Sequence, residues 1–118
     1  MDNAVARAEE AGIDRSRVIV DPGIGFGKTV AHNLALLRSL GLLHETGCAI
    51  LLGASRKRFI GTLTGVDAAS ERVAGSLAVA LQGAAQGVQI LRVHDVIETR
   101  QALQMWLAMN IIENGAVA

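Results

Sequence analysis

Six polar or charged residues follow or end short apolar runs of this sequence, and their types suit the binding of an anionic ligand. They are Asp21, Ser55, Arg56, Lys57, Arg92 and His94. Arg92 and His94 are two residues apart in a predicted strand, so their side chains point the same way. Two neighbouring donors that carry or can gain positive charge suit a phosphate or pyrophosphate group.

Three apolar runs are the predicted strands that bring these residues together. They are 17-RVIV-20, 48-CAILL-52 and 89-QILRV-93. Continuous rather than alternating apolarity is typical of strands buried on both faces of a parallel sheet. Helical patterns flank and separate them, over residues 3–12, 32–43, 70–87 and 95–109. Crossovers of this length imply parallel strands, whose carboxyl ends share one rim.

The predicted fold class is α/β, as part of a (β/α)₈ TIM barrel. Three parallel strands and four helices leave two open sheet edges, which is unusual for a complete domain. A whole barrel typically has about 250 residues, whereas this chain has 118. We therefore predict that residues 1–118 form one segment of a barrel domain. The tail over 110–118 carries no periodic signal and is expected to fray.

The composition argues against several classes of partner. The chain has 11 Lys and Arg and 11 Asp and Glu, so it offers no excess of positive charge for nucleic acid or an anionic membrane. Its apolar runs are shorter than the ~18 residues of a membrane helix. The lone Cys48 is expected to be a small buried thiol, which favours a cytoplasmic setting. With 51 % hydrophobic residues, the chain is expected to bury area against a partner or to belong to something larger.

The glycine-rich stretch 21-DPGIGFGKT-29 resembles a phosphate loop but fails the spacing. The Walker A pattern needs a glycine where Pro22 stands, and the dinucleotide pattern needs one where Lys28 stands. The glycines instead allow unusual backbone angles and close approach to a flat ligand. Asp21 then supplies a carboxylate at the strand end, and Phe26 can supply an aromatic wall.

Three motifs, in this order and spacing, closely resemble the dihydropteroate synthase family, the folate-pathway enzymes that sulfonamides target. They are 21-DPGIGFGK-28, 53-GASRKRFIG-61 and 92-RVHDV-96. Shared segments such as 32-HN-33 and 70-SERVAGSLA-78 extend the resemblance through nearly the whole chain. The resemblance implies the C-terminal part of a (β/α)₈ barrel, with strands six, seven and eight. It also implies condensation of p-aminobenzoate with 6-hydroxymethyl-7,8-dihydropterin pyrophosphate to 7,8-dihydropteroate and pyrophosphate.

The resemblance implies roles for residues at the strand ends. Asp21 would bind the pterin N–H groups and stabilise positive charge as pyrophosphate departs. Lys57 would contact the pterin, and Arg92 would lie against its face and reach the pyrophosphate. His94 would bind the pyrophosphate and ease its departure. Gly53 would let the pterin approach the strand end. Asp21, Lys57, Arg92 and His94 are thus the implied catalytic residues.

A second set of residues is implied for p-aminobenzoate. Phe26 and Ser55 would line its pocket, and Lys57 would help to close it. The N-terminus of a short helix after Ser55 could favour the carboxylate of this substrate. Arg58 stands where some family members have serine, a difference that bears on the same pocket.

The resemblance also implies Mg²⁺ as a cofactor, with its principal ligand outside this chain. The family's asparagine for Mg²⁺ and pyrophosphate lies on its first strand, so no metal ligand is assigned within these 118 residues. The expected partners are the two small-molecule substrates and, as often in the family, a second copy of the protein. No nucleic acid or membrane partner is expected.

Two alternatives to a dihydropteroate synthase segment stay open. A related pterin-binding barrel transfers methyl groups from a folate to a corrinoid, although 55-SRK-57 and 92-RVH-94 favour the synthase. A catalytically inactive fragment is the second alternative, because strands of the barrel are missing and the apolar content is high. The isolated chain is expected to make no dihydropteroate.

Overall fold

Three short parallel strands form the sheet of the structure, a computed structural model that describes residues 2–110. The strands are β1 (Ile19–Val20), β2 (Ala49–Leu52) and β3 (Ile90–Leu91), in the spatial order β1-β2-β3. The paired residues are Ile19 with Ala49, Val20 with Ile50, Leu51 with Ile90 and Leu52 with Leu91. The prediction of three parallel strands is confirmed, and each strand is shorter than its apolar run.

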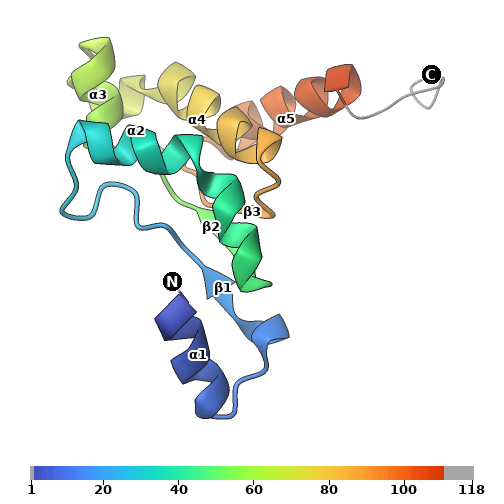
Figure 1. The fold of residues 1–118 in the computed structure, drawn as a ribbon. Coiled ribbons are helices and arrows are strands. Elements are labelled where there is room, and N and C mark those ends of the chain that lie inside the picture. Colours follow the sequence, from blue (N-terminus) through green and yellow to red (C-terminus); the bar gives the residue numbers. More distant parts are fainter. Residues whose placement is uncertain (1, 111–118) are drawn as a thin grey trace.

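Five α-helices connect and flank the strands in the described part of the chain (Figure 1). They are α1 (Asp2–Glu10), α2 (Val30–Arg38), α3 (Arg58–Thr64), α4 (Val73–Ala85) and α5 (Val96–Asn110). Four of them lie where long helical patterns were predicted, and α3 is the short helix that the resemblance implied after Ser55. The predicted helix 32–43 instead divides into α2 and a 3₁₀ segment over Leu40–Thr46. Ser39 and Gly41, which are weak helix formers, lie at this division.

The last helix reaches the end of the described residues. It includes Asn110, where the frayed tail was predicted to begin, and residues 111–118 lie outside the described residues. Figure 1 shows α5 leading away from the sheet beyond α4.

Small residues form the face of α4 that packs closely on the sheet. The buried residues of α4 are Ser76, Ala80 and Gly83. A Cβ atom at Gly83 would stand 2.7 Å from Cδ2 of Leu52, so only glycine permits this approach without a shift. The predicted apolar stripe through Leu77 and Leu81 is only partly buried, because close packing places small side chains against β2.

Only one face of β2 is fully buried. Ile50 and Leu52 are 0 % and 2 % exposed, whereas Ala49 and Leu51, which point the opposite way, are partly exposed. Ile19 of β1 is 54 % exposed. The expectation that the strands are buried on both faces is therefore wrong for residues 2–110, because nothing within them fully covers the second face. In a complete barrel that face would point into the interior.

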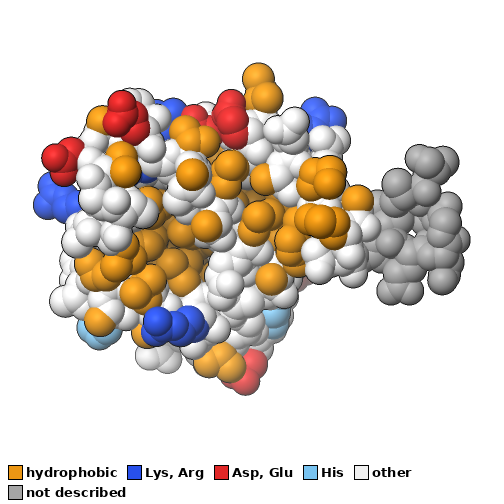
Figure 2. All heavy atoms as spheres, turned by 90° about the horizontal axis from the view of Figure 1, so that it is seen from above, with side chains coloured by type: hydrophobic (Ala, Val, Ile, Leu, Met, Phe, Trp, Pro, Cys, Tyr) orange, Lys and Arg blue, Asp and Glu red, His pale blue; other side chains and the backbone are white. Residues whose placement is uncertain are grey.

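Several large hydrophobic side chains are exposed, and Figure 2 shows hydrophobic groups spread over the face seen there. They include Leu63, Val96, Ile97, Met105 and Met109. The sequence favoured a core or helix-interface position for Met105, which is 57 % exposed in this chain. None of the helices within residues 2–110 is long and apolar enough to cross a membrane. The exposed apolar groups agree with the high hydrophobic content noted in the sequence.

Candidate functional site

The loop between β1 and α2 is held by its own polar groups. The Asp21 carboxylate accepts a 2.7 Å hydrogen bond from the Gly23 N–H, and the Gly25 N–H donates to Asn33 Oδ1 at 2.9 Å. Gly23 and Gly25 have φ of 73° and 86°, which favour glycine. Lys28 Nζ donates to the Gly23 carbonyl at 2.8 Å, so it folds back on the loop. The lysine of the apparent phosphate loop therefore has a structural contact.

Asn33 is the buried support of this loop, and its replacement is expected to destabilise the protein. Asn33 is 2 % exposed, so Asn33→Ala leaves the Gly25 N–H without its acceptor. We expect a loss of about 1–3 kcal/mol in the free energy of unfolding, measured by urea denaturation. His32→Ala, at the exposed neighbouring position, is the control and should change stability little. Equal stability of the two variants would contradict this assignment.

The turn after β2 places Ser55 and Lys57 through an unusual backbone at Arg56. Arg56 has φ 58°, in the left-handed region, which costs a non-glycine residue about 1 kcal/mol. Its N–H donates to Ser76 Oγ at 2.8 Å, and its carbonyl accepts from Arg72 Nη1 at 2.9 Å. Two residues next to or within α4 thus hold the turn in shape.

The Arg56 side chain makes an ion pair instead of facing the ligand rim. Its Nη2 and Nε donate to the two carboxylate oxygens of Asp95 at 2.6 and 3.1 Å. These hydrogen bonds lower the pKa of Asp95 and raise that of Arg56. Because the Asp95 pKa is lowered, the pair stabilises the fold at neutral pH, and that contribution is lost as pH falls through the folded-state pKa. The prediction that Arg56 shares the rim as a ligand-binding group is therefore wrong in this structure.

A cavity of about 320 Å³ lies where the predicted residues meet. Its lining residues are Phe26, Gly53, Ser55, Lys57, Arg92, Val93 and His94. Six of these seven were predicted from the sequence to bind substrates. They come from the segments that follow all three strands, as expected for the carboxyl ends of a parallel sheet. Asp21 is not among the lining residues, although its charge acts on Lys57.

Lys57 is held at the junction of two loops. Its Nζ donates to the Ile24 carbonyl and lies 4.2 Å from the centre of the Phe26 ring. Burial lowers the pKa of Lys57, and the neighbouring charge of Arg92 lowers it further, while the Asp21 carboxylate acts in the opposite direction. The ammonium group is thus partly desolvated, which strengthens its attraction for an anion.

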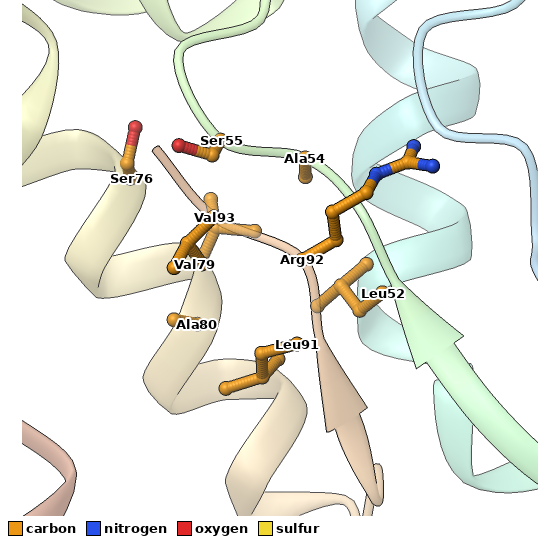
Figure 3. A pocket seen from close by; sticks show the side chains of 9 residues that line it. All are labelled: Leu52, Ala54, Ser55, Ser76, Val79, Ala80, Leu91, Arg92 and Val93. Atoms are coloured by element: carbon orange, nitrogen blue, oxygen red, sulfur yellow. The ribbon is translucent and has the colours of Figure 1, made fainter. Parts of the chain in front are cut away.

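Gly53 makes room for Arg92. A Cβ atom at Gly53 would stand 2.6 Å from Nη2 of Arg92, so the guanidinium lies directly against the glycine backbone. The resemblance implied that this glycine admits the pterin, and the structure gives it this additional function. Figure 3 shows Val93 turned toward α4, beside Val79, and Arg92 turned the opposite way. Alternation along the strand end therefore separates the packing side chain from the cationic one.

Ser55 and His94 are in direct contact. Ser55 Oγ accepts from the His94 N–H at 3.2 Å and lies 3.0 Å from His94 Nδ1. A serine hydroxyl has one proton to donate and two lone pairs that can accept, so Ser55 can either donate to Nδ1 or accept from it. In both cases Nδ1 is engaged by Ser55, and Nε2 can carry a proton where Ser55 donates or where the imidazole is protonated. The free edge of His94 can then donate to an anion.

A second cavity of about 580 Å³ adjoins the first. Its lining residues are Gly25, Phe26, Gly27, Lys28, Val30, Asn33, Lys57, Arg58, Phe59 and Thr62. Three of them are cationic, none is acidic, and two are aromatic. Phe26 and Lys57 also line the first cavity, so they stand between the two. The composition of the second cavity suits a flat ligand that carries a negative group.

Comparisons with known proteins agree with this arrangement. Residues 1–94 match the model of a family described as "Pterin binding enzyme". The chain belongs to the pterin-binding enzyme family. Its fold is that of part of a (β/α)₈ barrel, as the sequence predicted.

Relatives of this member of the pterin-binding enzyme family are named dihydropteroate synthases. One from Neisseria meningitidis serogroup B is 54 % identical over 104 residues, which are 86 % of this chain and 36 % of the relative. One from Mycobacterium leprae, named "Inactive dihydropteroate synthase 2", is 44 % identical over 86 % of this chain and 35 % of its own length. The chain thus spans about a third of the curated relatives that it matches.

Solved structures show the same likeness. The dihydropteroate synthase of Xanthomonas albilineans, 48 % identical, has been solved with 4-aminobenzoic acid and with 7,8-dihydropteroate. Both structures match 94 % of this chain with a TM-score of 0.91, and the match covers 41 % and 42 % of their chains.

Sequence reasoning missed the residues that support the lining of the first cavity. Asn33, Ser76 and Asp95 hold the loops that carry the lining side chains, yet the sequence assigned none of them a role at the cavity and gave Asp95 only that of a helix cap. All three lie within or next to segments that the resemblance singled out. What the sequence lacked was the contact partner of each residue, since these partners are 8 to 39 residues away.

Proposed function

We propose that this chain supplies one part of the active site of a dihydropteroate synthase. That enzyme joins p-aminobenzoate to 6-hydroxymethyl-7,8-dihydropterin pyrophosphate and releases pyrophosphate. The observation that carries the proposal is the 320 Å³ cavity, in which Lys57, Arg92 and His94 meet beside Gly53 and Ser55. The reactions and ligands named for the synthase relatives support it.

The cationic groups of this cavity suit the departing pyrophosphate. The C–O bond of the pterin methylene breaks, and pyrophosphate leaves with the electron pair. Arg92 and the Nε2 edge of His94 would donate hydrogen bonds to its oxygens as negative charge develops there. Asp21 would bind the pterin N–H groups and stabilise the positive charge left on the pterin. Its loop hydrogen bond to Gly23 helps to fix the carboxylate.

The second cavity suits p-aminobenzoate. Phe26 would offer an aromatic wall, and Lys57 would lie at the boundary where the two substrates meet. The amine of p-aminobenzoate would form the new C–N bond and lose a proton. Arg58, exposed at the lining of this cavity, would donate hydrogen bonds to the carboxylate of p-aminobenzoate. Ser55 lines the first cavity, so its part in this pocket stays a prediction.

Mg²⁺ belongs to the proposal through residues outside this chain. Among residues 2–110, no three His, Cys, Asp or Glu side chains lie close enough together to hold a metal ion. We also propose a cytoplasmic setting, a homodimer for the complete enzyme, and sulfonamides as competitors of p-aminobenzoate at the second cavity.

A chimera tests the proposed function. The matching 104-residue segment of the Neisseria meningitidis relative is replaced by this chain, and 7,8-dihydropteroate is measured with both substrates and Mg²⁺. Product that requires both substrates is the expected result. A chimera that unfolds at the same temperature as its parent and makes no product would contradict the proposal and favour an inactive segment.

The isolated chain is expected to make no 7,8-dihydropteroate. It spans 36 % of its synthase relative, and one face of its sheet is incompletely covered. The measurement is product formation by the purified 118-residue chain with both substrates and Mg²⁺. The chimera under the same conditions is the positive control, and turnover by the chain alone would refute this prediction.

A further inference from the structure

Arg56 has a backbone conformation that its neighbours must maintain. A long side chain at φ 58° is uncommon and persists where surrounding contacts hold it. Ser76 accepts from the Arg56 N–H at 2.8 Å, and Arg72 donates to the Arg56 carbonyl at 2.9 Å. Ser76 Oγ in turn donates to the Arg72 carbonyl at 2.7 Å. The peptide groups of residue 56 are thereby fixed against the start of α4.

The Arg56 side chain connects this turn to the segment that follows β3. Both carboxylate oxygens of Asp95 accept from its guanidinium, at 2.6 and 3.1 Å. The two side chains are 27 % and 12 % exposed, so the pair is partly shielded from water. A two-point contact between planar groups fixes orientation as well as distance. Neither Arg56 nor Asp95 lines the candidate cavity.

The residues adjacent to this pair do line the cavity. Ser55 and Lys57 flank Arg56, and His94 precedes Asp95. One ion pair therefore ties together the two segments that carry these lining residues. If the pair opens, the left-handed turn loses its side-chain anchor, and the rotation of Lys57 toward solvent is opposed by its contacts with the Ile24 carbonyl and the Phe26 ring.

We propose that Arg56 and Asp95 are positioning residues, whose ion pair keeps Ser55 and Lys57 in the cavity beside Arg92 and His94. The inference deepens the proposed function and rests on it for the identity of the ligand. The geometric effect on Lys57 does not require a ligand. It can therefore be tested in the chain as it is.

The test measures the pKa of Lys57 in the ligand-free chain. The sequence has two lysines, Lys28 and Lys57, so ¹³C-methylated lysine signals can be assigned and followed by NMR as pH changes. The variants are Arg56→Gln, Asp95→Asn and the exchange Arg56→Asp with Asp95→Arg. Glu9→Gln is the matched control, since the Glu9–Arg15 pair has the same 2.6 Å separation but is about 40 % exposed and remote from the cavity.

Positioning and direct charge effects predict opposite signs for Asp95→Asn and the same sign for Arg56→Gln. Removal of the Arg56 charge alone would raise the pKa of Lys57, and removal of the Asp95 charge alone would lower it. Loss of positioning raises it in both variants, because Lys57 leaves the partly buried site whose desolvation lowers its pKa. We expect a rise toward the ordinary lysine value in both single variants, the low value in the exchange variant, and no change in the control.

Three outcomes would overturn the inference. They are an unchanged or lower Lys57 pKa in folded Asp95→Asn, a wild-type pKa in folded Arg56→Gln, and an exchange variant that is unfolded or has an ordinary Lys57 pKa. If the single variants do not fold, as judged by circular dichroism, the exchange variant alone decides.

A titration with inorganic pyrophosphate separates this inference from the proposed function. Pyrophosphate is titrated into the chimera, and the Lys57 pKa is measured in the isolated chain and its variants. If the chimera does not bind pyrophosphate but the Lys57 pKa changes in the variants as expected, the result counts against the proposed function and leaves the positioning effect of the ion pair in place. If the chimera binds pyrophosphate but the Lys57 pKa does not change in the variants as expected, the result counts against the positioning effect and leaves the proposed function in place.

Discussion

Arg92→Ala in the chimera is expected to lower kcat/KM by about 10²–10³-fold, which is the usual cost of removing one preorganised donor to developing charge. Arg92 lines the candidate cavity, and its guanidinium is oriented by contact with Gly53. Steady-state kinetics of pyrophosphate release measure the effect. Arg100→Ala, an exposed arginine of α5 outside this cavity, is the control and should leave turnover unchanged. A similar kcat/KM for both variants would show that Arg92 takes no part in turnover.

Gly53→Ala tests the contact between Gly53 and Arg92 by changing the glycine instead of the arginine. The added Cβ would stand 2.6 Å from Nη2 of Arg92, so the guanidinium must move. We expect turnover in the chimera to fall about tenfold or more, as a misplaced catalytic group commonly causes. Stability should change little, because the displaced atoms end a flexible side chain. Gly41→Ala is the matched control, since its Cβ would meet Gln86 Oε1 at an ordinary 3.8 Å. Equal turnover in the two variants would show that the position of Arg92 is not critical.

Lys57→Ala in the chimera is expected to lower kcat/KM by about 10–100-fold, the value of a hydrogen bond between charged groups. Lys57 is shared by the two cavities, so its loss affects both proposed substrates. Kinetics with each substrate varied in turn measure the effect, and unchanged KM and kcat for both would contradict it.

The pH dependence of the same chimera gives an independent check on Lys57. Burial lowers the pKa of Lys57, so the group loses its proton at a lower pH than an ordinary lysine. Affinity that depends on its positive charge is therefore present below this pKa and falls as pH rises through it. The corresponding alkaline limb of the kcat/KM profile should be absent in Lys57→Ala.

The sequence was sufficient to predict the scaffold and six of the seven residues that line the first cavity, although the predicted Asp21 and Arg56 do not line it. Apolar runs separated by helical patterns are local signals, so three parallel strands followed directly. Alternation along a strand predicted that Arg92 and His94 share a side, and both line the cavity. The motifs then named Phe26, Gly53, Ser55 and Lys57, all of which line it as well.

The extent of burial could not be predicted in the same way. The second face of a strand is buried only if other chain covers it, and nothing within residues 2–110 does so fully. An apolar run does not show which other strands or helices pack against it in the folded protein. The sequence therefore predicted strands that a complete barrel would bury, and the structure shows one face of them covered.

The tertiary structure decided which charged residues line the cavities and which support the loops around them. Arg56, Lys57 and Arg58 are consecutive and equally basic, so their sequence does not distinguish them. Arg56 is turned to Asp95, a residue 39 positions away, while Lys57 lies over Phe26 and Arg58 borders the second cavity. The sequence by itself determined three parallel strands and, through its motifs, six of the seven residues that line the first cavity, because apolar runs and motifs are local patterns. Only the folded chain decided the division of roles, because it depends on contacts between segments that are distant in sequence.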